Sequence, residues 1–216
     1  MDIRESNLDL HEYAKTFASQ GGVEIGSWLE GYASEVPAGS AIVELGSWLG
    51  AGTAHLALGA QKSGAEIYVY DRFLCANDEE RTKAARCGVQ LFIGENTLPR
   101  VSGALEAFPV VIHYIKGSFK PGAKSARWDD KPIGLYVDDL TKAEWLWSYA
   151  MEVFGAHFIP EKTILVLMDY HFDEAAGPTY AAQKRYMARH KDEFEFLGDR
   201  MGGTSVAVFR FLGWKQ

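Results

Sequence analysis

The stretch VELGSWLGAG, residues 43–52, decides the fold of this chain. It continues the short apolar run AIVEL (41–45), which is typical of a buried parallel strand. The helix-forming sequence TAHLALGAQKS (53–63) comes next. Glycines between a strand and a helix let the backbone turn sharply and approach a ligand closely, and the helix start directs free N–H groups at the same place. The stretch therefore predicts a strand, a ligand-binding turn and a helix.

Four further apolar runs predict four more parallel strands: EIYVYD (66–71), VVIHYIKG (110–117), GLYVDD (134–139) and TILVLMD (163–169). Helical patterns over residues 141–158 and 96–108 lie between them. Near the end of the chain, EFEFLGD (193–199) and TSVAVFRF (204–211) surround a Gly-Gly turn and predict an antiparallel hairpin. The sequence thus predicts an α/β protein with a doubly wound, mostly parallel, seven-stranded Rossmann-like sheet and a C-terminal antiparallel hairpin.

The composition limits the partners of the chain. A length of 216 residues fits one domain, and a net charge of -7 without a basic footprint argues against nucleic acid. The charged start is unlike a secretory signal, and no run approaches the roughly 20 apolar residues of a membrane span. Its two cysteines have no metal-site spacing and fit a reducing compartment. We expect a cytoplasmic protein with a small-molecule partner, and leave open whether it forms a homodimer.

Two segments are candidates for covering a bound ligand. Residues 1–35 are predicted to form a helical cap or lid, in which GSWLEGYASEV (26–36) folds over the ligand. Residues 36–216 then form the ligand-binding part of the single domain. The loop 121–132 is basic and contains Gly and Trp, which suits a mobile cover for the substrate.

An acidic residue after the second predicted strand indicates the kind of ligand. Asp71 lies 19 residues after Gly52, close to the roughly 20 expected of an acid that hydrogen-bonds a ribose. The GxxxGxG spacing differs from the GxGxxG of dinucleotide sites, and Trp48 in its middle would obstruct a pyrophosphate. The sequence therefore predicts a cofactor that contains a nucleoside.

The glycine-rich turn resembles motif I of the class I S-adenosylmethionine-dependent methyltransferases, whose cofactor has no phosphates. Four segments are similar to strand-end motifs of the macrocin-type sugar O-methyltransferases: VELGSWLGAGTAHLALGAQKSGAEIYVYDRF (43–73), IHYIKGSF (112–119), GLYVDDL (134–140) and LVLMDY (165–170). The likeness covers roughly residues 22–212. It implies a methyltransferase fold, S-adenosylmethionine as cofactor, and O-methylation of a hydroxyl on a sugar, natural product or phenol.

Residues that end the strands of such a sheet converge on one crevice. We expect Glu44 to face the cationic methionine end of the cofactor, Asp71 and Arg72 the ribose, and Ser118 with Phe119 the adenine. The predicted cofactor-binding residues are Glu44, Gly46, Ser47, Trp48, Gly50, Thr53, Asp71, Arg72, Ser118, Phe119 and Asp138.

Methyl transfer to a hydroxyl requires alignment of the reacting atoms and a route for the hydroxyl proton. Three residues near the ends of the fourth and fifth predicted strands are candidates for the catalytic base: Asp138, Lys142 and His171.

A metal ion is the alternative way to activate the hydroxyl. Relatives of catechol O-methyltransferase and the macrocin-type enzymes hold Mg²⁺ with an acid ending the fourth strand and an acid-acid or acid-amide pair ending the fifth. Here Met168 or Tyr170 takes one position of that pair, which removes a charge and a ligand. Asp138 and Asp169 remain as candidate Mg²⁺ ligands, and Asp139 or His171 is expected to complete the site. Without a metal, the acids are expected to act as a base and its orienting partner.

Two other functions fit parts of the sequence. Tyr180 and Lys184 match the YxxxK of short-chain dehydrogenases, which would make the protein an NAD(P)-dependent reductase. That family needs a further parallel strand, whereas the 32 residues after Lys184 predict a helix end and a hairpin. A nucleoside-binding module without catalysis is the third reading.

Overall fold

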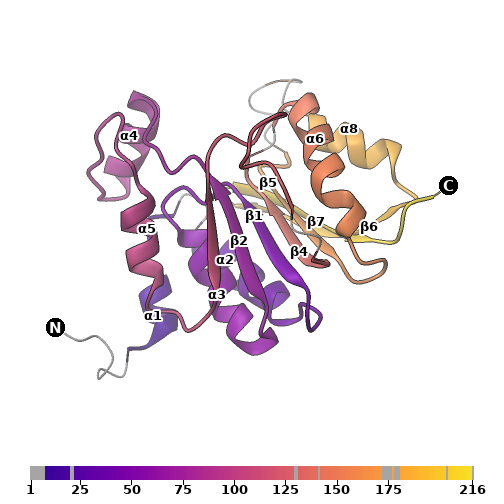
Figure 1. The fold of residues 1–216 in the computed structure, drawn as a ribbon, viewed down its shortest axis with the longest axis horizontal. Coiled ribbons are helices and arrows are strands. Elements are labelled where there is room, and N and C mark those ends of the chain that lie inside the picture. The colour runs from indigo at the N-terminus through magenta and orange to yellow at the C-terminus, as the bar shows by residue number, and fades with distance from the viewer. Residues whose placement is uncertain are drawn as a thin grey trace.

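The computed structural model describes residues 8–19, 22–128, 131–140, 142–171, 177, 181–202 and 204–215. Its centre is a seven-stranded sheet in the order β3-β2-β1-β4-β5-β7-β6 (Figure 1). The strands are β1 (Ala41–Leu45), β2 (Glu66–Asp71), β3 (Ile112–Lys116), β4 (Ile133–Asp138), β5 (Ile164–Met168), β6 (Phe194–Gly202) and β7 (Thr204–Phe211). Strands β1 to β5 are parallel, whereas β7 is antiparallel to both β5 and β6. The predicted fold class is confirmed, including the terminal hairpin.

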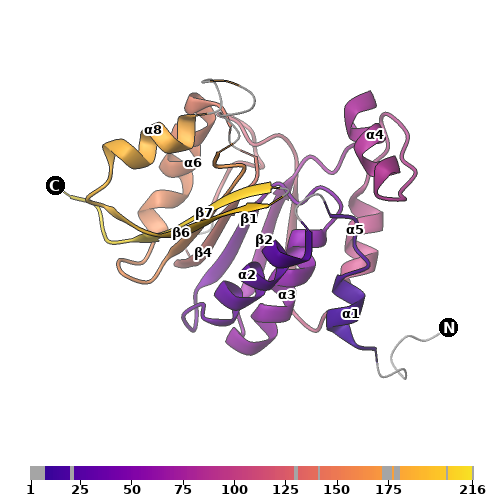
Figure 2. The same ribbon diagram turned by 180° about the vertical axis from the view of Figure 1, so that it is seen from behind.

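Helices cover both faces of this sheet. Figures 1 and 2 show α2 (Gly22–Ser34) and α3 (Ala51–Ser63) on one face, with α6 (Glu144–Phe154) and α8 (Ala182–Arg189) on the other. Three shorter helices stand at the side of the sheet that ends in β3: α1 (Leu10–Ala14), α4 (Asp78–Arg86) and α5 (Leu98–Leu105). A 3₁₀ turn, η2 (Gly155–His157), follows α6.

Alternation along the central strands divides the apolar core in two. In β1, Ile42 packs among residues of α2 and α3, whereas Val43 and Leu45 pack among residues of α6. Successive side chains of a strand point to opposite faces, and all five residues of β1 are buried, as expected for a parallel strand covered on both sides. The polar groups at the strand ends are left facing a common edge of the sheet.

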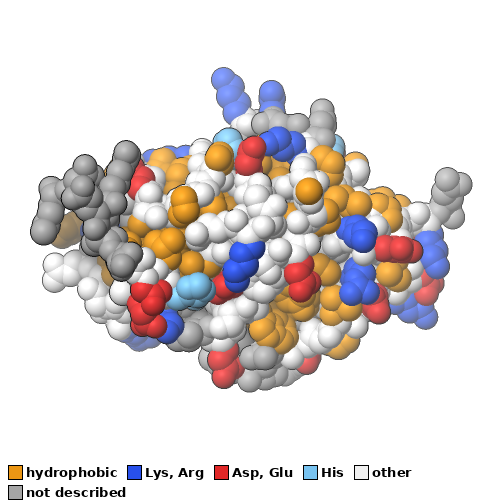
Figure 3. All heavy atoms as spheres, turned by 90° about the horizontal axis from the view of Figure 1, so that it is seen from below, with side chains coloured by type: hydrophobic (Ala, Val, Ile, Leu, Met, Phe, Trp, Pro, Cys, Tyr) orange, Lys and Arg blue, Asp and Glu red, His pale blue; other side chains and the backbone are white. Residues whose placement is uncertain are grey.

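The helices differ from the sequence prediction in extent and number. The helix predicted over residues 141–158 is limited to α6 and η2, and the one predicted over 96–108 to α5. Helix α4 was not predicted. Among the described helices, none has both the length and the apolar character of a membrane-spanning helix. On the face seen in Figure 3, acidic and basic side chains are interspersed among hydrophobic ones.

The described part of the loop 121–132 is attached to the sheet and to α6. The Tyr70 hydroxyl donates to the Arg127 carbonyl at 2.7 Å, and the Tyr149 hydroxyl to the Ala126 carbonyl at 3.4 Å. Ala126 is buried in the core beside α6. Movement of this loop over a substrate stays a prediction. The division of the chain into a cap, residues 1–35, and a ligand-binding part, residues 36–216, also stays a prediction.

Candidate functional site

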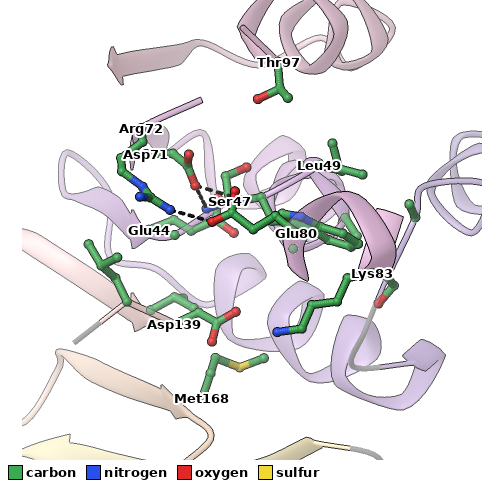
Figure 4. Close-up of a pocket in the computed structure, with 18 of the residues that line it drawn as sticks. Glu44, Ser47, Leu49, Asp71, Arg72, Glu80, Lys83, Thr97, Asp139 and Met168 are labelled. Carbon is green, nitrogen blue, oxygen red and sulfur yellow. Dashed lines mark hydrogen bonds and ion pairs between the residues drawn. The ribbon is translucent and has the colours of Figure 1, made fainter. Parts of the chain in front are cut away.

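A cavity of about 550 Å³ opens at the carboxyl ends of the five parallel strands. Its volume lies within the range of small-molecule sites. Figure 4 shows acidic, basic and apolar side chains converging on it from different elements. The strand-end residues that line it are Glu44, Gly46, Ser47, Trp48, Asp71, Arg72, Gly117, Ser118, Phe119, Asp139, Leu140, Met168 and Asp169. The structure thus brings together eight of the eleven predicted cofactor-binding residues.

The glycine-rich turn after β1 is held by the acid that ends β2. The backbone N–H groups of Ser47 and Trp48 donate to Asp71 Oδ2 at 2.9 and 3.0 Å, and that of Phe73 donates to Oδ1 at 2.5 Å. Trp48 has a φ of 48°, in the left-handed region, so this turn is one that few non-glycine residues adopt. Asp71 therefore fixes the turn while its carboxylate lines the cavity.

Glu44 is a buried acid on the cavity wall without a cationic partner in the described contacts. The Thr53 hydroxyl donates to its Oε2 at 2.5 Å, and the Ser47 and Thr53 hydroxyls are 2.8 Å apart. Burial, together with the nearby Asp71 and Asp139 carboxylates, raises the pKa of Glu44 to about 8, although the Thr53 hydrogen bond opposes this. A cation bound here would favour the ionised carboxylate.

Two glycines make this arrangement possible for different reasons. Gly50 has a φ of 88°, and a Cβ on it would lie 3.2 Å from Val101 Cγ1. A Cβ on Gly52 would lie 2.6 Å from Glu44 Oε1. Gly52 therefore leaves room for the Glu44 carboxylate, whereas Gly50 serves the turn itself and its packing against α5. Neither Gly50 nor Thr53 lines the cavity.

The paired acids after β4 have different surroundings. Asp138 is fully buried, accepts hydrogen bonds from the Tyr136 hydroxyl at 3.1 Å and the Leu140 backbone N–H at 3.0 Å, and does not line the cavity. Asp139 does line it, and 44% of its side-chain surface is accessible. This partial burial raises the pKa of Asp139 to about 6; Lys142 opposes the shift and Asp169 adds to it.

Lys142 lies between the acids that follow β4 and β5, Asp139 and Asp169. Its Nζ is 3.4 Å from Asp139 Oδ1 and 3.5 Å from Asp169 Oδ2, and it donates to the Met168 carbonyl at 2.7 Å. Among the described residues, no group of three or more His, Cys, Asp or Glu side chains is arranged to hold a metal ion. Asp138 accepts from the Tyr136 hydroxyl away from the cavity, and the Lys142 ammonium lies between Asp139 and Asp169, so these donors do not fit the Mg²⁺ site considered from the sequence.

Of the other predicted residues, Arg72 lines the cavity, whereas His171 and Lys184 do not. Arg72 Nη2 donates to Glu80 Oε1 of α4 at 2.6 Å. His171 Nε2 lies 3.0 Å from Asp199 Oδ2 of β6, and its ring is not on the cavity wall. Lys184, on α8, does not line the cavity either, and Tyr180 lies outside the described residues.

Two parts of the cavity wall escaped the sequence analysis. One is the segment containing α4, which contributes Leu74, Cys75, Glu80, Lys83 and Leu91. The acid-rich start and basic end of DEERTKAAR, with Asn77 as N-cap, are signals that predict this helix.

The other part is His55 on α3. His55 lines the cavity, and its Nδ1 is buried and has no hydrogen-bond partner among the described residues. A Cβ on Gly26 of α2 would lie 2.4 Å from His55 Nε2, so Gly26 makes room for the ring. Burial lowers the pKa of His55, which favours the neutral imidazole. The sequence signal for His55 as a cavity residue is its position one helical turn after Ala51, on the same face of α3.

Comparison with known proteins identifies the fold. No protein-family model matches the sequence, and no curated protein matches it. Solved structures do match. The methyltransferase PaMTH1 from Podospora anserina, bound to S-adenosylhomocysteine (SAH), gives a TM-score of 0.59 at 12% identity over 95% of this chain and 87% of that one. The fold is that of the S-adenosylmethionine-dependent methyltransferases.

Two more structures with this methyltransferase fold hold S-adenosylmethionine or SAH. The O-methyltransferase TomG from Streptomyces achromogenes, involved in tomaymycin synthesis and in complex with S-adenosylmethionine, gives a TM-score of 0.56 at 13% identity, covering 96% of this chain and 92% of that one. A methyltransferase from Thiobacillus denitrificans in complex with SAH gives a TM-score of 0.52 at 14% identity, covering 93% of this chain and 75% of that one.

Proposed function

We propose that this protein is an S-adenosylmethionine-dependent methyltransferase that modifies a hydroxyl group on a small molecule. The observation that carries the proposal is the cavity at the carboxyl ends of the strands, where the β1 turn is tied to Asp71 and meets the buried Glu44. The methyltransferase neighbours crystallised with S-adenosylmethionine or SAH support it.

The polar groups of the cavity suit the parts of this cofactor. Asp71 Oδ1 accepts a hydrogen bond from the Phe73 backbone N–H, which leaves acceptor capacity for a ribose hydroxyl. Glu44 offers a carboxyl group to the amine and sulfonium of the methionine part, and its raised pKa marks it as an acid that lacks a cation. His55 lines the same cavity, its Nδ1 has no hydrogen-bond partner among the described residues, and its imidazole suits the methionine carboxylate.

Bound S-adenosylmethionine would supply a methyl group on a positively charged sulfur. The chain then has to align an acceptor oxygen with that methyl group and remove the hydroxyl proton. Asp139 takes the proton, because it lines the cavity and its pKa, raised to about 6, is near working pH. Apolar side chains of Leu140, Leu146 and Met168 form the neighbouring wall and suit a ring-shaped or apolar acceptor.

The proposal is tested by incubating the protein with S-adenosylmethionine and a panel of sugars, phenols and hydroxylated natural products. We expect SAH to accumulate together with one methylated product, both detected by mass spectrometry. The variant Asp139→Asn should lower the rate by about 10²-fold or more while leaving SAH binding intact. Tight SAH binding without turnover on any acceptor would instead favour a nucleoside-binding module.

A further inference from the structure

The acids after β4 and β5 are held together by a lysine. Lys142 Nζ lies between Asp139 Oδ1 at 3.4 Å and Asp169 Oδ2 at 3.5 Å, with the Met168 carbonyl at 2.7 Å. The lysine side chain is only 19% exposed. Two carboxylates and one carbonyl oxygen, at the ends of two neighbouring strands, thus surround a single ammonium group.

The groups around Lys142 do not suit a divalent cation. Mg²⁺ requires about six oxygens in octahedral geometry at about 2.0–2.1 Å, and an ammonium group beside the ligands would repel it. Two acidic side chains of the described residues meet here, and Met168 contributes its backbone carbonyl in place of a carboxylate.

We propose that the Lys142 ammonium occupies the position that a divalent cation would otherwise take, so that this site works without a metal ion. The ammonium bridges two strand ends and neutralises part of the charge of Asp139 and Asp169. It acts as a positioning group that keeps Asp139 directed into the cavity. Its consequence for methyl transfer rests on the proposed function, whereas the exclusion of metal rests on the geometry alone.

Metal binding can be measured directly from the electron paramagnetic resonance signal of free Mn²⁺, which decreases when the ion binds. We expect the parent protein to leave the signal unchanged at millimolar Mn²⁺. The variant Lys142→Met exposes two uncompensated carboxylates and should bind Mn²⁺ at least about tenfold more tightly than the parent. The control Lys142→Arg keeps the positive charge and should behave like the parent.

Two results would overturn the proposal. One is micromolar Mn²⁺ binding by the parent protein, a measurement that depends on no variant. The other is a folded Lys142→Met protein that binds Mn²⁺ no better than Lys142→Arg, because the lysine would then not be what excludes the ion.

The link to methyl transfer is tested separately. SAH binding and turnover by the parent should be the same after exhaustive chelation as after addition of Mg²⁺. Loss of turnover in chelator, restored by Mg²⁺, would contradict a metal-free site. Failure to bind SAH under either condition would count against the proposed function. The Mn²⁺ measurement would then decide by itself whether Lys142 excludes a divalent cation.

Discussion

The backbone N–H of Trp48 donates a hydrogen bond to Asp71 Oδ2 at 3.0 Å, which ties the turn after β1 to the end of β2. A strained turn and the acid expected to contact the ribose are therefore one unit. Loss of Asp71 should affect the shape of the cavity as well as a direct contact with ligand.

Replacing Asp71 with Ala should weaken SAH binding by about 1–3 kcal/mol, or about 5- to 150-fold, because a charge-assisted hydrogen bond is removed. Isothermal titration calorimetry measures this directly. Asp192→Ala, at an exposed acid outside the cavity, is the charge-matched control and should bind as the parent does. An Asp71→Ala protein with parental affinity would show that this acid does not contact the cofactor.

Replacing His55 with Ala should weaken SAH binding by about tenfold or more, because the carboxylate of the ligand loses its hydrogen-bond partner. Methylthioadenosine lacks the amino-acid part of SAH and should bind the variant and the parent equally. Calorimetry with both ligands separates a local contact from general damage. An equal loss for the two ligands would mean that His55 shapes the cavity and does not contact the carboxylate.

The burial of Glu44 should make the unliganded protein less stable as the pH rises. Its pKa is about 8 in the folded state against an ordinary value of 4.5, so between these values the folded protein holds a proton that the unfolded chain has lost. The stabilising contribution is complete below pH 4.5 and is lost as pH rises through about 8.

Urea unfolding from pH 5 to 8.5 tests this linkage in the parent and in Glu44→Gln. The free energy of unfolding of the parent should fall over this range by a few kcal/mol more than that of the variant, since one proton corresponds to about 1.4 kcal/mol per pH unit. Parallel curves for the two proteins would show that Glu44 does not titrate as its surroundings indicate.

Gly50→Ala should destabilise the protein by about 1–2 kcal/mol, because an L-residue is disfavoured at a φ of 88° and its Cβ would approach Val101. Gly31→Ala is the matched control, since a Cβ there meets nothing within 4 Å and the residue is inside α2. It should raise stability by about 0.4–1 kcal/mol. Equal denaturant midpoints for the two variants would contradict this account of the turn.

Patterns of apolar residues were sufficient to predict the sheet and its hairpin, because five short buried runs and two alternating ones correspond to the seven strands. Helix α4 was missed because its polar sequence buries only Ala84 and so gives no apolar periodicity. Its Asn77 cap and its charge gradient were the available signals.

The details of the site were harder to predict than its location. Alternation along β4 places Asp138 on the same side as Tyr136, and Asp138 accepts a hydrogen bond from the Tyr136 hydroxyl. Asp139 follows the last residue of the strand and lines the cavity. Side chains alternate along a strand, so Asp138, two residues after the buried Tyr136, is expected on the same side as Tyr136, and Asp139 on the other. This alternation would have distinguished the two acids. The position of the Lys142 ammonium depends on a long flexible side chain and on a tertiary contact with β5, which a pattern in one sequence does not specify.

The most direct test of the central claim is calorimetric titration of the purified protein with SAH and, separately, with NADPH. We predict micromolar binding of SAH, with release of a proton near pH 7 as Glu44 ionises beside the ligand amine, and no binding of NADPH. Micromolar binding of NADPH with none of SAH would contradict the account.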